Sequence, residues 1–177
     1  MKSRSSKAGK IIAGGLLACA AFVGALYLDH DIGVRRSKLE EDIRMSQKIK
    51  EDWAVEGAAS DTVAAYISYP PDRSDHTFSV YVNRSGLSLG YFFRAGGSLS
   101  GVDEGIAAYT IEGYGERAFI SMNKQGAERL EIGDGNSVEK IEIDGSKPFA
   151  IVLPANVGTI TFYDGDENEI PFWEHSL

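Results

Sequence analysis

The feature that most constrains this chain is an uncharged apolar run near its start. Residues 11–28 read IIAGGLLACAAFVGALYL, and Asp29, His30 and Asp31 follow directly. Eighteen residues make about 27 Å of helix, which is close to the thickness of the hydrocarbon core of a bilayer. The run therefore predicts a transmembrane helix over residues 11–28.

The charges before this run predict its orientation. Residues 1–10 contain four basic residues and no acidic one: Lys2, Arg4, Lys7 and Lys10. Positive flanks stay on the cytoplasmic side, so residues 1–10 are expected to form a cytoplasmic basic tail. The run then acts as a signal anchor, and everything after Leu28 lies outside the cytoplasm.

Two processing patterns in the same run remain open alternatives to a permanent anchor. Leu16–Cys19 resembles the lipobox of bacterial lipoproteins, although the apolar run continues well past Cys19. Val23–Ala25 offers the small residues that a signal peptidase prefers. An uncleaved anchor is the favoured interpretation.

Residues 29–60 are expected to form a helical juxtamembrane stalk. Ser37 is a candidate N-cap with Glu40 three positions later, which is the capping-box pattern. The apolar residues of the expected helix, Ser37 to Ser60, are sparse: Leu39, Ile43, Ile49 and Trp53. They are too few for a coiled coil, so the far end of the stalk is expected to dock on the following domain.

From Thr62 onward the apolar pattern changes to a period of two, with frequent Gly, Asn, Asp and Pro. Residues 61–177 are therefore expected to form an acidic, all-β extracytoplasmic domain, built as a sandwich or a small barrel. About nine short strands are predicted: 63–69, 77–82, 87–94, 107–112, 117–122, 128–132, 138–143, 149–153 and 159–163.

Charge and cysteine content exclude several classes of function. The 177 residues contain 18 basic and 26 acidic side chains, and residues 53–177 alone carry a net charge of −11. Nucleic-acid binding needs an excess of Lys and Arg, so no nucleic-acid partner is expected. Anionic lipid headgroups should repel such a domain, which gives a stalk an electrostatic role. The single cysteine, Cys19, cannot form an internal disulfide.

Two short motifs suggest an alternative function as a small serine hydrolase. Gly86–Gly90 matches G-x-S-x-G with Ser88 at its centre, and Ser121–Lys124 matches S-x-x-K. The first motif needs a turn from a strand into a helix, whereas the residues after Ser88 alternate as a strand. The second lies at a predicted strand end, and its usual partner motifs are missing. Catalysis by Ser88 or Ser121 is therefore the less favoured hypothesis.

An acidic stretch near the C-terminus suggests a weak calcium loop. Asp164, Asp166 and Asn168 place oxygen ligands at alternate positions, although the glycine and glutamate of an EF-hand are not at the required places. A solvated hairpin turn is the simpler interpretation. No other cofactor is expected, because the three histidines have no ligand-like spacing.

The segment from His76 to Arg94 is the most informative about a partner. Folding it as a hairpin across Arg84-Ser85 aligns the large aliphatic side chains on one face, through the pairs Val82 with Leu87, Val80 with Leu89 and Phe78 with Tyr91. The opposite face then exposes Tyr81, Phe92 and Arg94, which are residue types enriched at protein interfaces. An equally simple interpretation is that Phe92 covers Gly90.

These features together predict a membrane-anchored, extracytoplasmic and non-enzymatic binding or accessory module. Its partners would be the membrane, through residues 11–28, and another protein or cell-surface component.

Overall fold

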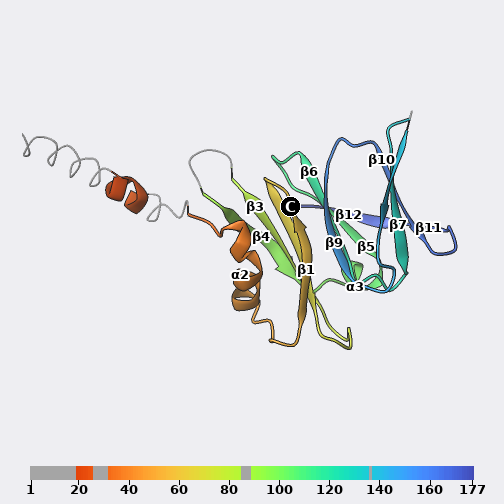
Figure 1. Ribbon diagram of the computed structural model, residues 1–177, viewed down its shortest axis with the longest axis horizontal. Coiled ribbons are helices and arrows are strands. Elements are labelled where there is room, and N and C mark those ends of the chain that lie inside the picture. Colours follow the sequence, from red (N-terminus) through yellow and green to blue (C-terminus); the bar gives the residue numbers. More distant parts are fainter. Residues whose placement is uncertain (1–18, 26–31, 85–88, 136) are drawn as a thin grey trace, which may run out of the picture.

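The computed structural model describes residues 19–25, 32–84, 89–135 and 137–177. Within these residues the chain is mainly β, with twelve strands in three four-stranded sheets. The sheets stack as layers, and one short helix covers an outer face of the stack (Figure 1). The mainly β expectation is confirmed, and the two-sheet sandwich is extended by a third sheet.

The first layer, here called the proximal sheet, is an antiparallel meander in the order β1-β2-β3-β4. Its strands are β1 (Ala54–Ala59), β2 (Val63–Tyr69), β3 (Thr77–Asn83) and β4 (Tyr91–Gly97). A five-residue helix, α3 (Ser100–Glu104), leads from β4 into the next layer.

The second layer, here called the middle sheet, has the order β12-β5-β6-β9. It contains β5 (Ile106–Thr110), β6 (Glu116–Ser121), β9 (Phe149–Pro154) and β12 (Phe172–Ser176). The C-terminal strand β12 runs parallel to β5, whereas the other pairs are antiparallel.

The third layer, here called the distal sheet, has the order β11-β10-β7-β8. It contains β7 (Ala127–Gly133), β8 (Val138–Glu142), β10 (Thr159–Asp164) and β11 (Glu169–Ile170). All its pairs are antiparallel. Three of the twelve strands, β1, β11 and β12, were not predicted from the sequence.

The middle sheet is buried on both faces, which explains the nearly continuous apolar character of β5 and β6. Ala107 and Tyr109 face the proximal sheet and belong to one core. Ile106, Ala108 and Phe119 face the distal sheet and belong to a second core with Leu130 and Phe162. Alternate side chains of a strand point to opposite faces, so one strand serves both cores.

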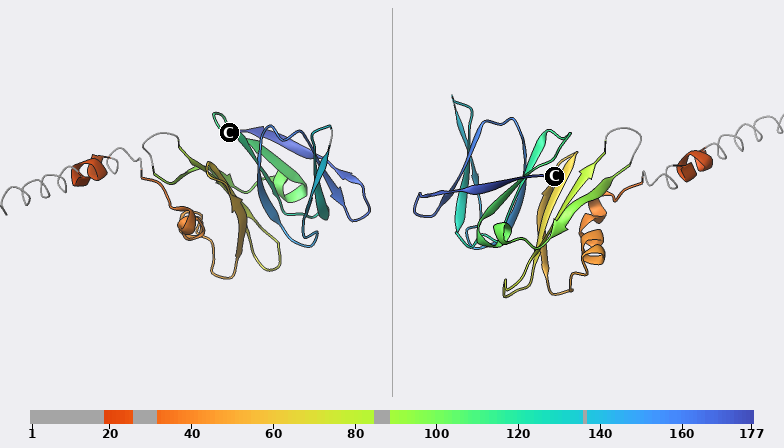
Figure 2. Two further views of the ribbon diagram at one scale, coloured as in Figure 1. Left: turned by 45° about the horizontal axis from the view of Figure 1, so that its top comes forward. Right: turned by 180° about the vertical axis from the view of Figure 1, so that it is seen from behind.

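The expected helical stalk is wrong over most of its length. A 3₁₀ turn at Arg36–Lys38 leads into α2 (Leu39–Ser46), and the chain then enters strand β1, which lies within the expected helix. Helix α2 lies on the outer face of the proximal sheet (Figure 2). Its Leu39 and Ile43 are fully buried there against Ala64, Tyr81 and Tyr91.

Helix α2 ends where the backbone turns left-handed at Lys48, with φ 56°. The amide of Ile49 donates to the Arg44 carbonyl at 2.9 Å, and the Arg44 guanidinium donates to the Trp53 carbonyl at 3.1 Å. These bonds turn the chain toward β1. The helix begins after Lys38, and Ser37 lies in the preceding 3₁₀ turn instead of capping the helix.

The β3–β4 register also differs from the prediction. Val82 pairs with Phe92 and Tyr81 with Phe93, whereas the sequence suggested Val82 opposite Leu87. Before the bulge at Arg94 the shift is odd, so Phe92 lies on the face of Val82 and Phe93 on the face of Tyr81. Beyond the bulge Val80 pairs with Ala95, and the shift there is even. The apolar pattern of these strands does not determine the register, because both faces are apolar. One face packs on the middle sheet, and the other packs under α2.

Little of the predicted membrane span falls within the described residues. Residues 19–25 are helical, and Phe22 and Val23 are about half exposed. Among the described residues, no helix is both long enough and apolar enough to cross a membrane. The basic tail, residues 11–18 and residues 26–28 lie outside the described residues, so the anchor stays a prediction.

Candidate functional site

The predicted surface patch of Tyr81, Phe92 and Arg94 does not form as expected. Tyr81 is fully buried under α2, and its hydroxyl donates to the Asp42 carboxylate at 2.7 Å. Burial and this hydrogen bond raise the pKa of Tyr81. Phe92 is half-buried, with the Arg84 guanidinium 4.1 Å from its ring centre. Of the three, only Arg94, at a β-bulge, is exposed. A single exposed patch is therefore wrong, because α2 covers the face that carries Tyr81.

Ser121, the serine of the S-x-x-K motif, is part of the hydrogen bonding that holds the fold together. Ser121 is buried at the end of β6, and its hydroxyl donates to the Gly105 carbonyl while accepting the Asn123 amide at 2.9 Å. Lys124 instead pairs with Asp103 at 2.7 Å. The hydroxyl of Ser121 is thus held between two backbone groups. Ser88 lies outside the described residues.

The acidic stretch after β10 forms a hairpin turn, as the simpler interpretation expected. The Asp164 carboxylate accepts the backbone amides of Asp166 and Asn168 at 2.9 and 2.8 Å. Hydrogen bonds from the Asn168 side chain lower the pKa of Asp164. The Asp164 carboxylate is therefore used by the turn. Within the described ranges, no cluster of His, Cys, Asp and Glu could hold a metal ion.

His76 lines a small hollow of about 250 Å³ between the β2–β3 and β4–α3 connections. The ring is buried, and its Nε2 accepts the Leu99 amide at 3.3 Å. Its Nδ1 lies 3.8 Å from Asp103, which also pairs with Lys124. These contacts tie the loop before α3 to the body of the domain, so His76 has a structural role there.

A second hollow, of about 450 Å³, lies where the β5–β6 turn approaches the end of β3. It is lined by Thr62, Asn83, Arg84 and Tyr114, among others. Beside it, the Glu116 carboxylate accepts the hydroxyls of Ser60 and Thr62. These polar contacts join the β1–β2 turn to β6.

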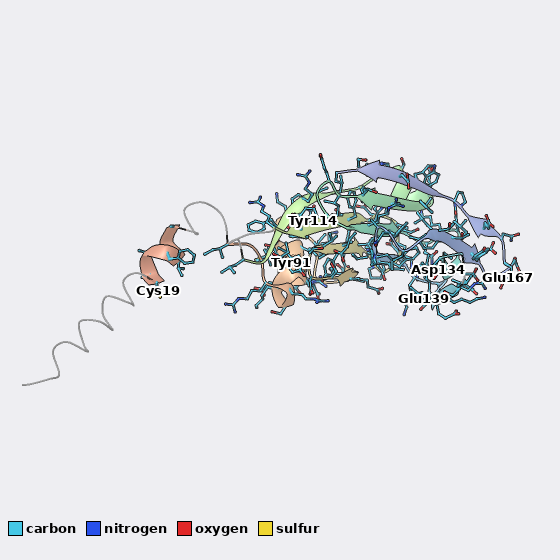
Figure 3. All side chains as sticks on the ribbon, turned by 90° about the horizontal axis from the view of Figure 1, so that it is seen from above. Cys19, Tyr91, Tyr114, Asp134, Glu139 and Glu167 are labelled. Atoms are coloured by element: carbon cyan, nitrogen blue, oxygen red, sulfur yellow. The ribbon has the colours of Figure 1, made fainter. Side chains whose placement is uncertain are left out.

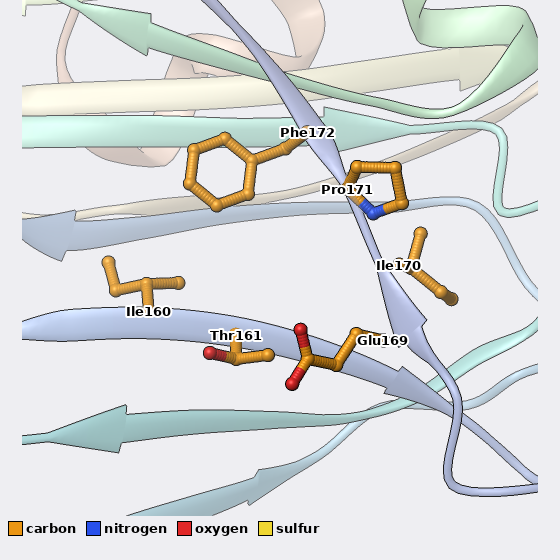
Figure 4. A pocket seen from close by; sticks show the side chains of 6 residues that line it. All are labelled: Ile160, Thr161, Glu169, Ile170, Pro171 and Phe172. Carbon is orange, nitrogen blue, oxygen red and sulfur yellow. The ribbon is translucent and has the colours of Figure 1, made fainter.

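The strongest candidate for a binding surface lies at an edge of the distal sheet, next to a hollow of about 290 Å³. Strand β11 pairs only with Phe162 and Tyr163 of β10. Pro171 has no N–H and follows directly, and the chain then crosses to the middle sheet as β12. Figure 4 shows this crossing, with Ile160 and Thr161 on β10 and Glu169, Ile170, Pro171 and Phe172 on the crossing chain.

This crossing leaves a short stretch of β10 without a neighbouring strand on one side. Thr159–Thr161 pair with β7 alone within the described part of the chain. The Asp164 amide donates to the Asn168 carbonyl, toward β11. Because strand groups alternate, the N–H and C=O of Ile160 point to that same side, into the open edge. Unpaired strand edges can accept another extended chain.

The distal sheet and its turns carry most of the net negative charge of the domain. Residues 127–147 and 159–170 contain three basic and ten acidic side chains, a net charge of −7. Residues 32–126 contain eleven basic and thirteen acidic ones, a net charge of only −2. Figure 3 shows Asp134, Glu139 and Glu167 at one end of the domain and Tyr91 and Tyr114 toward the other.

The three basic side chains of this region are used internally. Arg129 pairs with Glu131 at 3.0 Å and with Glu167, and it stacks on Tyr163. Lys140 pairs with Glu131 at 3.0 Å, and Lys147 pairs with Asp144 at 3.1 Å. Five exposed carboxylates there have no ion pair with any described residue: Glu128, Glu139, Glu142, Asp166 and Glu169.

Sequence reasoning missed this site, because the predicted patch lay on β3 and β4. One signal was available: a proline at residue 171, so soon after the acidic turn, limits the return strand of the hairpin to two residues. No protein-family model, no curated protein and no solved structure matches this chain.

Proposed function

We propose that this protein is a membrane-anchored, extracytoplasmic, non-enzymatic binding module that captures an extended segment of another protein along β10. The observation that carries this proposal is the open β10 edge beside the hollow at Ile160 and Phe172. Backbone hydrogen bonds to the edge would provide affinity, and the hollow would accept a side chain of the partner.

The chemistry of this surface suggests what the partner segment looks like. The hollow is bordered by the apolar side chains of Ile160, Ile170 and Phe172, so an apolar side chain of the partner fits it. Glu169 stands at its rim without an ion pair among the described residues. Because the distal sheet and its turns carry a net charge of −7, basic residues flanking that apolar side chain would be favoured.

Binding is favoured over hydrolysis for a specific reason. Ser121, one of two serines named for catalysis, is buried and hydrogen-bonded to backbone groups on both sides of its hydroxyl. A nucleophile needs access to the substrate and a base beside it. Ser121 has neither accessibility nor a base in contact among the described residues.

Site-specific photo-crosslinking in cells tests this proposal. A benzophenone amino acid replaces Thr161, which lies beside the open edge, in the full chain at its natural abundance. The matched control places it at Lys140, exposed on the opposite edge of the same sheet. We expect an adduct of higher mass from Thr161 and none from Lys140. Adducts from both positions, or from neither, would refute binding at the β10 edge.

A further inference from the structure

The first described residues after the predicted span are hydrogen-bonded into the domain. The Gly33 amide donates to the Leu89 carbonyl at 2.6 Å. Val34 and Tyr91 exchange two bonds of 2.8 Å, each amide donating to the carbonyl of the other. Residues 32–34 thus extend the proximal sheet beyond the β4 edge.

Two glycines allow this close approach. A Cβ on Gly33 would lie 2.6 Å from the Tyr91 carbonyl oxygen, which is too close for any side chain. Gly90 has a φ of +92°, and a Cβ there would lie 2.7 Å from the Val34 carbonyl oxygen. The contact between the two backbones therefore depends on glycine at both positions.

This bonding leaves very little chain between the predicted span and the domain. Only residues 29–31 separate Leu28, the last residue of the span, from Ile32. A fully extended chain advances at most about 3.3–3.6 Å per residue, so Ile32 lies within about 14 Å of the end of the span. The headgroup region of one leaflet is about 5–8 Å thick. Residues 29–60 therefore cannot hold the domain off the membrane as a stalk would.

Two apolar side chains are exposed at this point. Ile32 and Leu89 form a bridge with each other, and both side chains remain exposed, by 42% and 60%. In the sequence, Asp29 and Asp31 precede Ile32 and Arg35 and Arg36 follow it, so the charges that flank Ile32 balance. The repulsion expected from the acidic domain is thus weaker here, because most of the net negative charge lies in and around the distal sheet.

We infer that this end of the domain rests on the bilayer, with Ile32 and Leu89 entering the phospholipid headgroup region. The inference rests on the proposed anchor and adds the orientation of the domain: proximal sheet at the membrane, β10 edge away from it. The tether of three residues keeps the exposed side chains of Ile32 and Leu89 close to the membrane interface.

Fluorescence quenching in phosphatidylcholine vesicles tests this contact. The full chain carries Cys19→Ser and a single new cysteine, Leu89→Cys, labelled with an environment-sensitive dye. The control is Val138→Cys on β8, which is 55% exposed and lies in the distal sheet. We expect a blue shift at position 89 and loss of emission when the lipids carry a shallow nitroxide quencher. Position 138 should show neither change.

Flotation of the vesicles tests the membrane anchor separately from the contact at Leu89. A chain that fails to float with the vesicles would refute the anchor, and the contact with it. A chain that floats but shows equal emission at position 89 with and without quencher would refute the contact alone. A Gly33→Val variant that floats should lose quenching at position 89, since the valine side chain would break the bond to Leu89. Undiminished quenching in that variant would also overturn the inference.

Discussion

Replacing Ile43 with alanine tests whether α2 is an integral part of the folded domain. Ile43 is fully buried between α2 and the proximal sheet. The substitution removes three carbon groups, worth about 0.8 kcal/mol each, and leaves a cavity that raises the loss to about 2.5–4 kcal/mol. For a chain of this size, that loss lowers the melting temperature by about 5–15 °C.

Thermal unfolding of the detergent-solubilised full chain, followed by tryptophan fluorescence, measures this effect. Met45→Ala is the matched control, because Met45 lies on the same helix and is 67% exposed. The control should change the free energy of unfolding by less than about 0.5 kcal/mol. Equal melting temperatures for the two variants would mean that α2 is a free stalk, and the argument from burial would fail.

Four further substitutions are expected to give distinct results. Tyr109→Phe should leave stability unchanged or raise it, because its buried hydroxyl has no partner among the described residues. Burial raises the pKa of Tyr109 in the folded protein from its ordinary value of 10.0 to about 12. The free energy of unfolding of the wild type, measured by urea titration, should therefore fall as the pH rises from 10 to 12, and it should fall less in Tyr109→Phe. In calorimetry, Phe92→Ala should lower the free energy of unfolding by about 1–2 kcal/mol, because Phe92 is half-buried. Tyr91→Ala should lower it by about 3–5 kcal/mol, because Tyr91 is buried. A fluorophosphonate probe should not label Ser121; labelling abolished by Ser121→Ala would contradict its structural role.

Most strand positions follow from the sequence alone. The predicted strand at 63–69 coincides with β2, and those at 149–153 and 159–163 each end one residue before β9 and β10 do. Runs of β-branched and aromatic residues separated by Gly, Asn and Asp are local signals, so they need no knowledge of the rest of the chain. The turn at Asp164 could be predicted from the same local signals.

Strand β1 could not be predicted from the sequence, because Ala54–Ala59 contains a single residue of high β propensity, Val55. It is a strand because it pairs along its whole length with β2. At Gly57, a Cβ would lie 2.1 Å from the Ala65 carbonyl oxygen, so this pairing also depends on glycine. Tertiary pairing overrode local preference there.

The sequence by itself determined the class of fold and most of the strands. Only the tertiary structure decided that residues 32–34 bond to Leu89 and Tyr91 where a stalk was predicted, and that α2 covers the proximal sheet. The tertiary structure also decided the register of β3 and β4 and the pairing of β12 with β5. Periodicity reports which residues of one segment share a face, but it does not name the segment that covers that face. The candidate sites at Ile160 and Leu89 both arise from such long-range choices, and the proline at residue 171 is the one local signal that points to either of them.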